Sequence, residues 1–271
     1  MPDDRLLEAV QAGVTVYDLS RPMQVGMPQS PNHPEYRHAL PRRHGDMVRA
    51  DGGSAASDIL VLGTHVGTHV DALCHVSHDG KLHGGHDAAT AQVGGRFSVH
   101  GAETIAPTVC RGVLLDVPAV LGVEACEPGY EVTAADLDAA AQAQGTPLRP
   151  GDAVLVRTGW GQRWDDKVAY LGHDTGVPGC GEEGAKWLAS HEPSFVGGDT
   201  IAFEQLKPGA GHALLPAHRV LLVETGISII ETMQLEELAA SRVREFVFVL
   251  ASLPLVGATG SPVRPLAVVG G

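Results

Sequence analysis

Basic residues are scarce in this chain. Its 271 residues include 19 Lys and Arg against 32 Asp and Glu, a formal net charge of -13 at pH 7, and no basic cluster interrupts this acidic balance. An acidic surface repels the phosphates of nucleic acids and the anionic headgroups of lipids. We therefore expect neither nucleic acid nor a membrane as a partner.

Long apolar runs and paired cysteines are also missing. No stretch approaches the ~18 apolar residues of a membrane span, and the N-terminus has no basic segment followed by an apolar one, so we expect a cytoplasmic protein. The cysteines form no C-x-x-C pair, which argues against a disulfide framework or a thiolate zinc site and predicts reduced, buried thiols. They are Cys74, Cys110, Cys126 and Cys180.

Glycine and proline, by contrast, are plentiful. The 34 Gly and 18 Pro favour turns and loops over a helical bundle. Prolines crowd residues 22–49, where we expect a long ordered arm without regular structure. The length, and the lack of a linker or internal repeat, predict a single domain over residues 1–271.

Apolar patterns predict strands that alternate unevenly with helices. This irregularity favours an α/β fold: a single domain with a mixed, barrel-like β-sheet flanked by helices. The expected strands are 15–19, 59–62, 112–117, 153–158, 195–197, 220–223 and 246–251. The expected helices are 5–11, 182–190, 236–240 and one that Thr133 caps and Gly145 ends.

Histidine is the most unusual component. Many of the 14 histidines lie between residues 65 and 100, where His65, His69, Asp71 and His75 follow one another closely. A strand end that turns into a helix near Asp71 would project two imidazoles and a carboxylate into one cleft. Such a set suits Zn, Mn or Fe(II) and leaves coordination positions for water and substrate. We expect His75 to act as an acid/base beside the metal, with a ligand role as the alternative.

A metal centre of this kind favours hydrolysis. The ion lowers the pKa of bound water from about 15.7 toward about 7 and polarises a carbonyl group. No G-x-S-x-G motif offers a serine nucleophile, and the glycine pairs form no phosphate-binding loop. Two alternatives stay open: a non-haem Fe(II) oxygenase, and a non-catalytic metal-binding or ligand-sensing protein.

The run His65-x-Gly67-Thr68-His69-x-Asp71, with His75 four residues beyond, strongly resembles the signature of the cyclase family of metal-dependent hydrolases. This family includes bacterial kynurenine formamidases and isatin hydrolases. The resemblance implies that the first two histidines and the aspartate bind Zn or Mn and that His75 transfers protons. The chain lacks the proline that formamidases have between the aspartate and the last histidine. Its loop at residues 76–85 also resembles that of isatin hydrolases more closely.

The resemblance also implies a second element, a histidine followed twelve residues later by a glutamate. His212 and Glu224 match it, and they are expected as ligands of a second ion or as hydrogen-bonding and acid/base groups. Their local context agrees for Glu224, because a carboxylate at the exit of the expected strand 220–223 lies more often at a site mouth than in a core.

The expected function is therefore that of a metal-dependent hydrolase with one or two Zn or Mn ions. Its substrate would be a small arylformamide or isatin-like lactam, with a lactone as the alternative. The family resemblance implies a homodimer or homotetramer with active sites near subunit contacts. We expect the arm at residues 22–49 to cross to a neighbouring subunit, the alternative being that it folds over its own.

Overall fold

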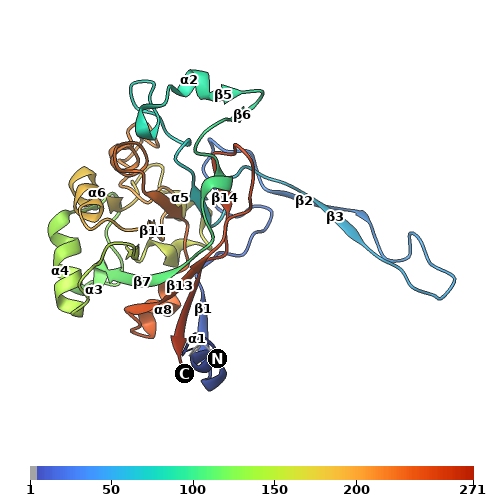
Figure 1. The fold of residues 1–271 in the computed structure, drawn as a ribbon, viewed down its shortest axis with the longest axis horizontal. Coiled ribbons are helices and arrows are strands. Elements are labelled where there is room, and N and C mark those ends of the chain that lie inside the picture. The colour runs from blue at the N-terminus through green and yellow to red at the C-terminus, as the bar shows by residue number, and fades with distance from the viewer. Residues whose placement is uncertain (1–4) are drawn as a thin grey trace.

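A mixed sheet of nine strands runs through the body of the molecule (Figure 1). This computed structural model describes residues 5–271. In the order in which they hydrogen-bond, the strands are β1 (Val14–Asp18), β15 (Leu266–Gly270), β13 (Glu245–Leu250), β7 (Thr108–Asp116), β9 (Ala153–Arg157), β11 (Phe195–Gly198), β12 (Ser228–Glu231), β4 (His69–Asp71) and β14 (Gly260–Pro262). The pairs from β7 to β12 are parallel and all others are antiparallel. The predicted α/β fold with a mixed, barrel-like sheet flanked by helices is confirmed.

Helices cover both faces of this sheet. One face packs against α3 (Val117–Leu121), α4 (Ala134–Gln144), α6 (Glu182–Ala189), α7 (Pro216–His218) and η4 (Arg219–Thr225). The other packs against α8 (Glu236–Ala240). Successive side chains of a strand point to opposite faces, so Leu115 joins the first core and Leu114 the second.

Shorter elements complete the chain. The remaining helices are α1 (Arg5–Ala12), η1 (His83–Gly85), α2 (Ala88–Ala91), η2 (Ala102–Thr104), η3 (Trp160–Arg163) and α5 (Lys167–Leu171). Three two-stranded ribbons pair β2 (Arg37–Arg42) with β3 (Ser57–Val61), β5 (Gln92–Val93) with β6 (Arg96–Phe97), and β8 (Glu131–Val132) with β10 (Gly179–Cys180). Within residues 5–271, no helix is long and apolar enough to cross a membrane.

The helix predicted between Thr133 and Gly145 is confirmed as α4. The Thr133 hydroxyl accepts from the Asp136 amide, the Asp136 carboxylate accepts from the Thr133 amide, and Gly145 ends the helix in a left-handed conformation. This capping box satisfies amides that would otherwise lack a partner at the first turn.

The strand predicted at residues 220–223 is wrong. These residues belong to η4, a π-type helix that continues from α7 and ends at Thr225, with Gly226 as its C-cap. A short, continuous apolar run is buried equally well as strand or as helix, so its pattern does not separate the two. The parallel strand next in sequence is β12, which begins at Ser228.

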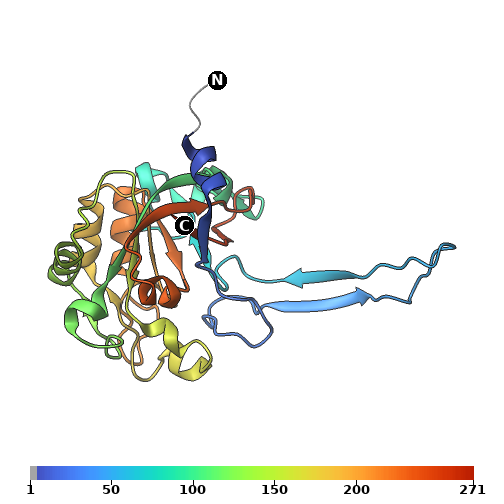
Figure 2. The same cartoon turned by 90° about the horizontal axis from the view of Figure 1, so that it is seen from below.

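The proline-rich arm divides into two parts. In the first part, Met27 and Tyr36 are buried against the molecule's own core beside Trp160 and Trp164. The second part forms the β2–β3 hairpin, which projects far from the body in both views (Figures 1 and 2). The expectation of no regular structure was therefore wrong for residues 37–42, because a two-stranded ribbon tolerates Pro41 at a register shift.

The cysteines are free, as the sequence predicts. Cys74, Cys126 and Cys180 are buried and Cys110 is half-buried. Burial raises the pKa of the Cys74 thiol to about 11 and that of Cys126 to about 12.

Candidate metal centre

The middle of the segment from His65 to His75 forms β4, a short strand of the main sheet. β4 lies between β12 and β14, and all three of its residues are buried. Gly67 precedes it with a φ of +67°, a left-handed conformation that glycine adopts without strain, and so turns the chain between His65 and His69. The helix expected near Asp71 does not form, because the chain makes a turn there that the His75 amide closes.

The structure brings His65, His69 and Asp71 together. His65 Nδ1 lies 2.7 Å from Asp71 Oδ1, and His69 Nε2 lies 3.6 Å from the same oxygen. The Nδ1–H of His69 donates to the Gly67 carbonyl at 2.8 Å, so Nε2 is the ring nitrogen that faces the carboxylate. All three side chains are buried, and one ligand atom from each lies within 4.8 Å of the others. This spacing is short enough for all three to bind one divalent cation.

His75 lies against this group. Its ring stacks on that of His65 with 3.8 Å between centroids and 26° between planes. With Asp71 and His218 it forms a second group whose ligand atoms lie within 4.8 Å of one another. Burial lowers the pKa of His75 to about 3, so its imidazole is neutral at neutral pH. The geometry thus accommodates both roles expected for this residue, acid/base and ligand.

Two residues that the sequence analysis missed complete the cluster. Glu231 is the last residue of β12, directly opposite His69 in the antiparallel pair, and its Oε2 lies 3.3 Å from His69 Nε2. His218 ends α7 and places Nε2 3.2 Å from Glu231 Oε1 and 3.6 Å from Asp71 Oδ2. The signal for Glu231 was a carboxylate that follows three isoleucines within residues 227–230.

The cluster has more acceptor atoms than donors. Asp71 Oδ2 and Glu231 Oε1 are buried and have no hydrogen-bond partner among the described residues. Burial alone would raise the pKa of Asp71, but the imidazoles of His75 and His65 lower it well below its ordinary value. Burial and Asp71 would likewise raise the pKa of Glu231, yet the neighbouring imidazoles of His218 and His69 lower it to about 2. Two ionised, buried carboxylates facing imidazole nitrogens are a donor set that fits a divalent cation.

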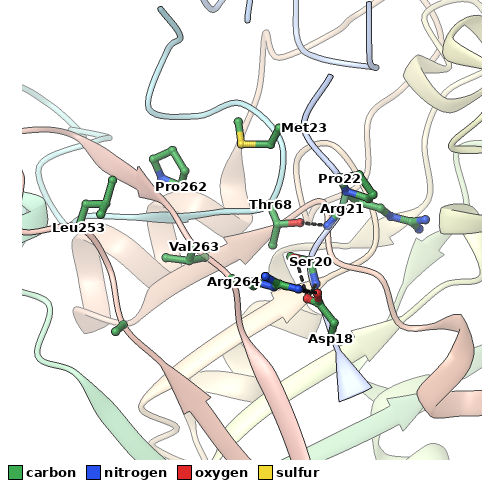
Figure 3. Close-up of a pocket in the computed structure, with 11 residues that line it drawn as sticks. Asp18, Ser20, Arg21, Pro22, Met23, Thr68, Leu253, Pro262, Val263 and Arg264 are labelled. Atoms are coloured by element: carbon green, nitrogen blue, oxygen red, sulfur yellow. Dashed lines mark hydrogen bonds and ion pairs between the residues drawn. The ribbon is translucent and has the colours of Figure 1, made fainter. Parts of the chain in front are cut away.

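The Thr68 side chain holds the backbone of the motif in place, and Figure 3 shows it with the dashed line to Arg21. Its hydroxyl accepts from the Arg21 amide at 2.8 Å and donates to the Thr232 carbonyl at 2.7 Å. Thr68 precedes His69 in the chain and Thr232 follows Glu231. The hydroxyl therefore holds together the two strand ends that carry the imidazole and the carboxylate.

His212 and Glu224 are placed differently from each other. His212 lines a small cavity with His65, His75 and His218, although its ring lies outside the two groups of converging ligand atoms in the described chain. Glu224 is the next-to-last residue of η4, is half-exposed and forms an ion pair with Arg219 at 3.0 Å. The structure does not bring Glu224 to the cluster, and the carboxylate found there is that of Glu231.

The arm contributes the imidazole of His33, which lies outside the sequence motif and was not predicted as a site residue. The ring of His33 stacks on that of His65, with 5.0 Å between centroids and 27° between planes. Burial lowers the pKa of His33 to about 4. Because His33 and Ser30 line the small cavity, the first part of the arm covers the site of its own subunit.

A larger cavity of about 410 Å³ adjoins the cluster, since it shares Ser30, Ile201 and His212 with the small one. Its lining is mostly apolar, with Asn32 and His173 among the polar groups. No Lys, Arg, Asp or Glu is among the described residues that line it. The cavity is large enough for a one- or two-ring molecule.

Comparisons with known proteins identify the family and several relatives of this chain. The model of the Cyclase family matches residues 17–205, a range that includes the first ligand group and ends before His218. An isatin hydrolase of Roseibium aggregatum is 29% identical over 224 residues, which cover 81% of this chain and 77% of the relative.

Solved structures share the whole fold. A protein described as a novel cyclase has a TM-score of 0.85 at 27% identity, over 98% of this chain and 93% of its own. An isatin hydrolase bound to the product analogue thioisatinate has a TM-score of 0.76 at 24% identity, over 100% of both chains. At 24% identity, the similarity to this second structure shows a shared fold only.

Proposed function

We propose that this chain, which belongs to the Cyclase family, is a metal-dependent hydrolase that uses activated water to open or cleave a small amide or lactam. The observation that carries the proposal is the buried convergence of His65, His69 and Asp71 with His218 and Glu231, in which two carboxylate oxygens lack a partner. The relative that is an isatin hydrolase supports the same reaction class.

His65, His69 and Asp71 would hold the ion. His218 and Glu231 either complete its surroundings or hold a second ion that shares Asp71. Imidazole and carboxylate donors suit Zn or Mn. When bound, the ion polarises a substrate carbonyl and acidifies a water molecule.

We assign proton transfer to His75. Its neutral ring lies beside the cluster, stacks on the ring of His65, and makes no side-chain hydrogen bond with the described residues. His75 takes a proton from water as the water oxygen bonds to the carbonyl carbon, and it delivers that proton to the leaving nitrogen as the C–N bond breaks. Water is thus added across the C–N bond, and no other reactant is needed.

The larger cavity favours an uncharged substrate. A ligand that carries an ammonium and a carboxylate would lose hydration there without gaining an ion pair from the lining. A neutral, planar lactam or arylformamide loses little on entry and is attracted by Leu171, Ile201 and Leu206. We therefore favour isatin-like lactams over arylformamides that bear an amino-acid group.

Anaerobic turnover tests the proposal. The metal-loaded protein is given isatin, a neutral N-formyl-arylamine, and an N-formyl-arylamine that carries an α-amino acid group. We expect hydrolysis of the neutral compounds without oxygen, with kcat/KM at least about tenfold higher than for the charged compound. A requirement for oxygen would indicate an oxygenase instead. Metal-loaded protein that hydrolyses none of these compounds or their lactone analogues would indicate a ligand sensor.

The projecting hairpin supports a homodimer or homotetramer. Each residue of β3 is exposed, including Ile59, Leu60 and Val61 at 55% each, so the body of the chain covers neither face of the ribbon. An isolated two-stranded ribbon is only marginally stable in water. We propose that the hairpin at residues 37–61 packs on a neighbouring subunit, whereas the first part of the arm stays on its own.

Light scattering with paired variants tests this assembly. Ile59 and Val61 lie on one face of β3, and the double change Ile59→Asp/Val61→Asp is expected to convert the oligomer to a folded monomer. Val168→Asp is the matched control, because Val168 is 82% exposed on α5 and far from the hairpin in sequence. A fully active wild-type monomer at micromolar concentration would contradict the proposal.

A further inference from the structure

Glu204 is a buried carboxylate outside the groups considered so far. It is 1% exposed and lies in the loop that follows β11. Its Oε1 accepts from the Ala217 amide at 3.2 Å. Its Oε2 accepts from the His218 amide at 3.0 Å and from His218 Nδ1 at 2.6 Å. Three N–H donors thus satisfy this carboxylate, and one of them belongs to an imidazole of the cluster.

The two ring nitrogens of His218 therefore face different partners. Nδ1 donates its proton to Glu204, while Nε2 points at Asp71 Oδ2 and Glu231 Oε1. A ring held with the proton on Nδ1 presents the Nε2 lone pair to those two carboxylates. That lone pair is the group that a cation between them would bind.

Other buried carboxylates provide a comparison. Asp199, also buried, accepts from the Thr158 amide and hydroxyl and from the Gly159 amide, so its hydrogen bonds hold loop backbone. It contacts no imidazole in any hydrogen bond of the described chain that involves its side chain. Glu204 also accepts from backbone amides, but in addition it accepts from the ring of His218. This contact with a ring of the cluster distinguishes Glu204 from Asp199, whose hydrogen bonds serve only the fold.

We propose that Glu204 is a positioning residue of the metal centre, which holds His218 in the Nδ1–H form with Nε2 directed at Asp71 and Glu231. The inference rests on the proposed metal-dependent function. A short hydrogen bond to a carboxylate fixes the orientation of an imidazole and makes its other nitrogen a better ligand. Loss of such a partner typically weakens metal binding by 10- to 100-fold.

The test compares Glu204→Gln with Asp199→Asn. Both changes remove one buried negative charge and place an amide NH₂ against backbone N–H groups, so both lower stability by a similar mechanism. The dissociation constant for Zn²⁺ is measured by competition with a chromophoric chelator. We expect it to rise about 10- to 100-fold in Glu204→Gln and to change less than about twofold in Asp199→Asn.

A second measurement uses the wild-type protein and so does not depend on how the variants fold. In zinc-loaded protein, nitrogen NMR of the His218 ring is expected to show a proton on Nδ1 with a strongly downfield resonance. A ring protonated on Nε2 would overturn the proposal. So would a folded Glu204→Gln variant that binds Zn²⁺ as tightly as the wild type.

These outcomes differ from failure of the proposed function. A wild-type protein that binds Zn²⁺ tightly but hydrolyses no carbonyl substrate would contradict the hydrolase proposal and leave the Glu204 comparison intact. A wild-type hydrolase whose zinc affinity is insensitive to Glu204→Gln would contradict only the role of Glu204.

Discussion

Glu231 and His69 face each other across the antiparallel pair of β12 and β4, with Glu231 Oε2 3.3 Å from His69 Nε2. The register of this pair joins two parts of the chain that are more than 150 residues apart. It brings a carboxylate to the motif that carries the imidazoles. The centre is therefore assembled by strand pairing as much as by the local motif.

This pairing predicts that metal binding depends on Glu231 and does not depend on Glu224. Glu231→Gln removes a buried, ionised carboxylate that faces two imidazoles. It should weaken metal binding by at least about 10- to 100-fold, because that is the typical loss when a residue that only hydrogen-bonds to a metal ligand is changed. Glu224→Gln is the matched control, because Glu224 pairs with Arg219 and is half-exposed. Metal content by elemental analysis distinguishes the two. Equal metal loss in both variants would contradict this assignment.

The short motif could be predicted because its residues are close in sequence. His65, His69 and Asp71 lie within seven positions, and Gly67 provides the turn that lets them converge. His218 and Glu231 could not be found in this way, because their place depends on the order of β11, β12 and β4 in the sheet.

The resemblance singled out Glu224 by its spacing from His212, and one incorrectly predicted element agreed with that choice. Residues 220–223 were interpreted as a strand, which placed its exit at Glu224. The rule that a carboxylate ends a buried strand beside a site holds here for β12 and Glu231 instead. The mixed sheet and α4 were predictable because several signals agreed for each, whereas a run of four apolar residues offers one ambiguous signal.

His75 gives a prediction that separates rate from metal binding. His75→Ala should keep the metal and lose on the order of a hundredfold or more in kcat, the usual loss when a general acid/base is removed. Metal content and turnover are measured on the same sample. Loss of the metal in this variant would make His75 a ligand.

Thr68 offers a prediction about stability. Thr68→Val keeps the shape of the side chain but leaves the Arg21 amide and the Thr232 carbonyl without their partner. We expect the free energy of unfolding to fall by about 2–3 kcal/mol, measured by urea denaturation. Thr68→Ser keeps the hydroxyl and should lose clearly less, so an equal loss in both variants would argue against these two hydrogen bonds.

The buried thiols predict a loss of stability at alkaline pH. Burial raises the pKa of Cys74 to about 11 and of Cys126 to about 12, from an ordinary value of 9.0. Because each thiol is neutral in the folded state, its contribution is complete below pH 9 and is lost as the pH rises toward 11–12. The free energy of unfolding should fall between pH 8 and pH 10 by about 1 kcal/mol per thiol.

The double variant Cys74→Ala/Cys126→Ala isolates this effect. Its stability at pH 8 is lower, because two buried side chains are truncated, but the further fall at pH 10 should be smaller than in the wild type. A fall of the same size in both proteins would assign the alkaline instability to other groups.

Removal and return of the metal tests the central claim most directly. Protein stripped by a chelator is titrated with Zn²⁺ or Mn²⁺ while bound ions and hydrolysis of a neutral lactam are measured together, with His69→Ala as the control. We expect the stripped protein to be folded and inactive, activity to return in step with one or two ions per chain, and no return in His69→Ala. Stripped protein that hydrolyses the lactam at the full rate would contradict the account.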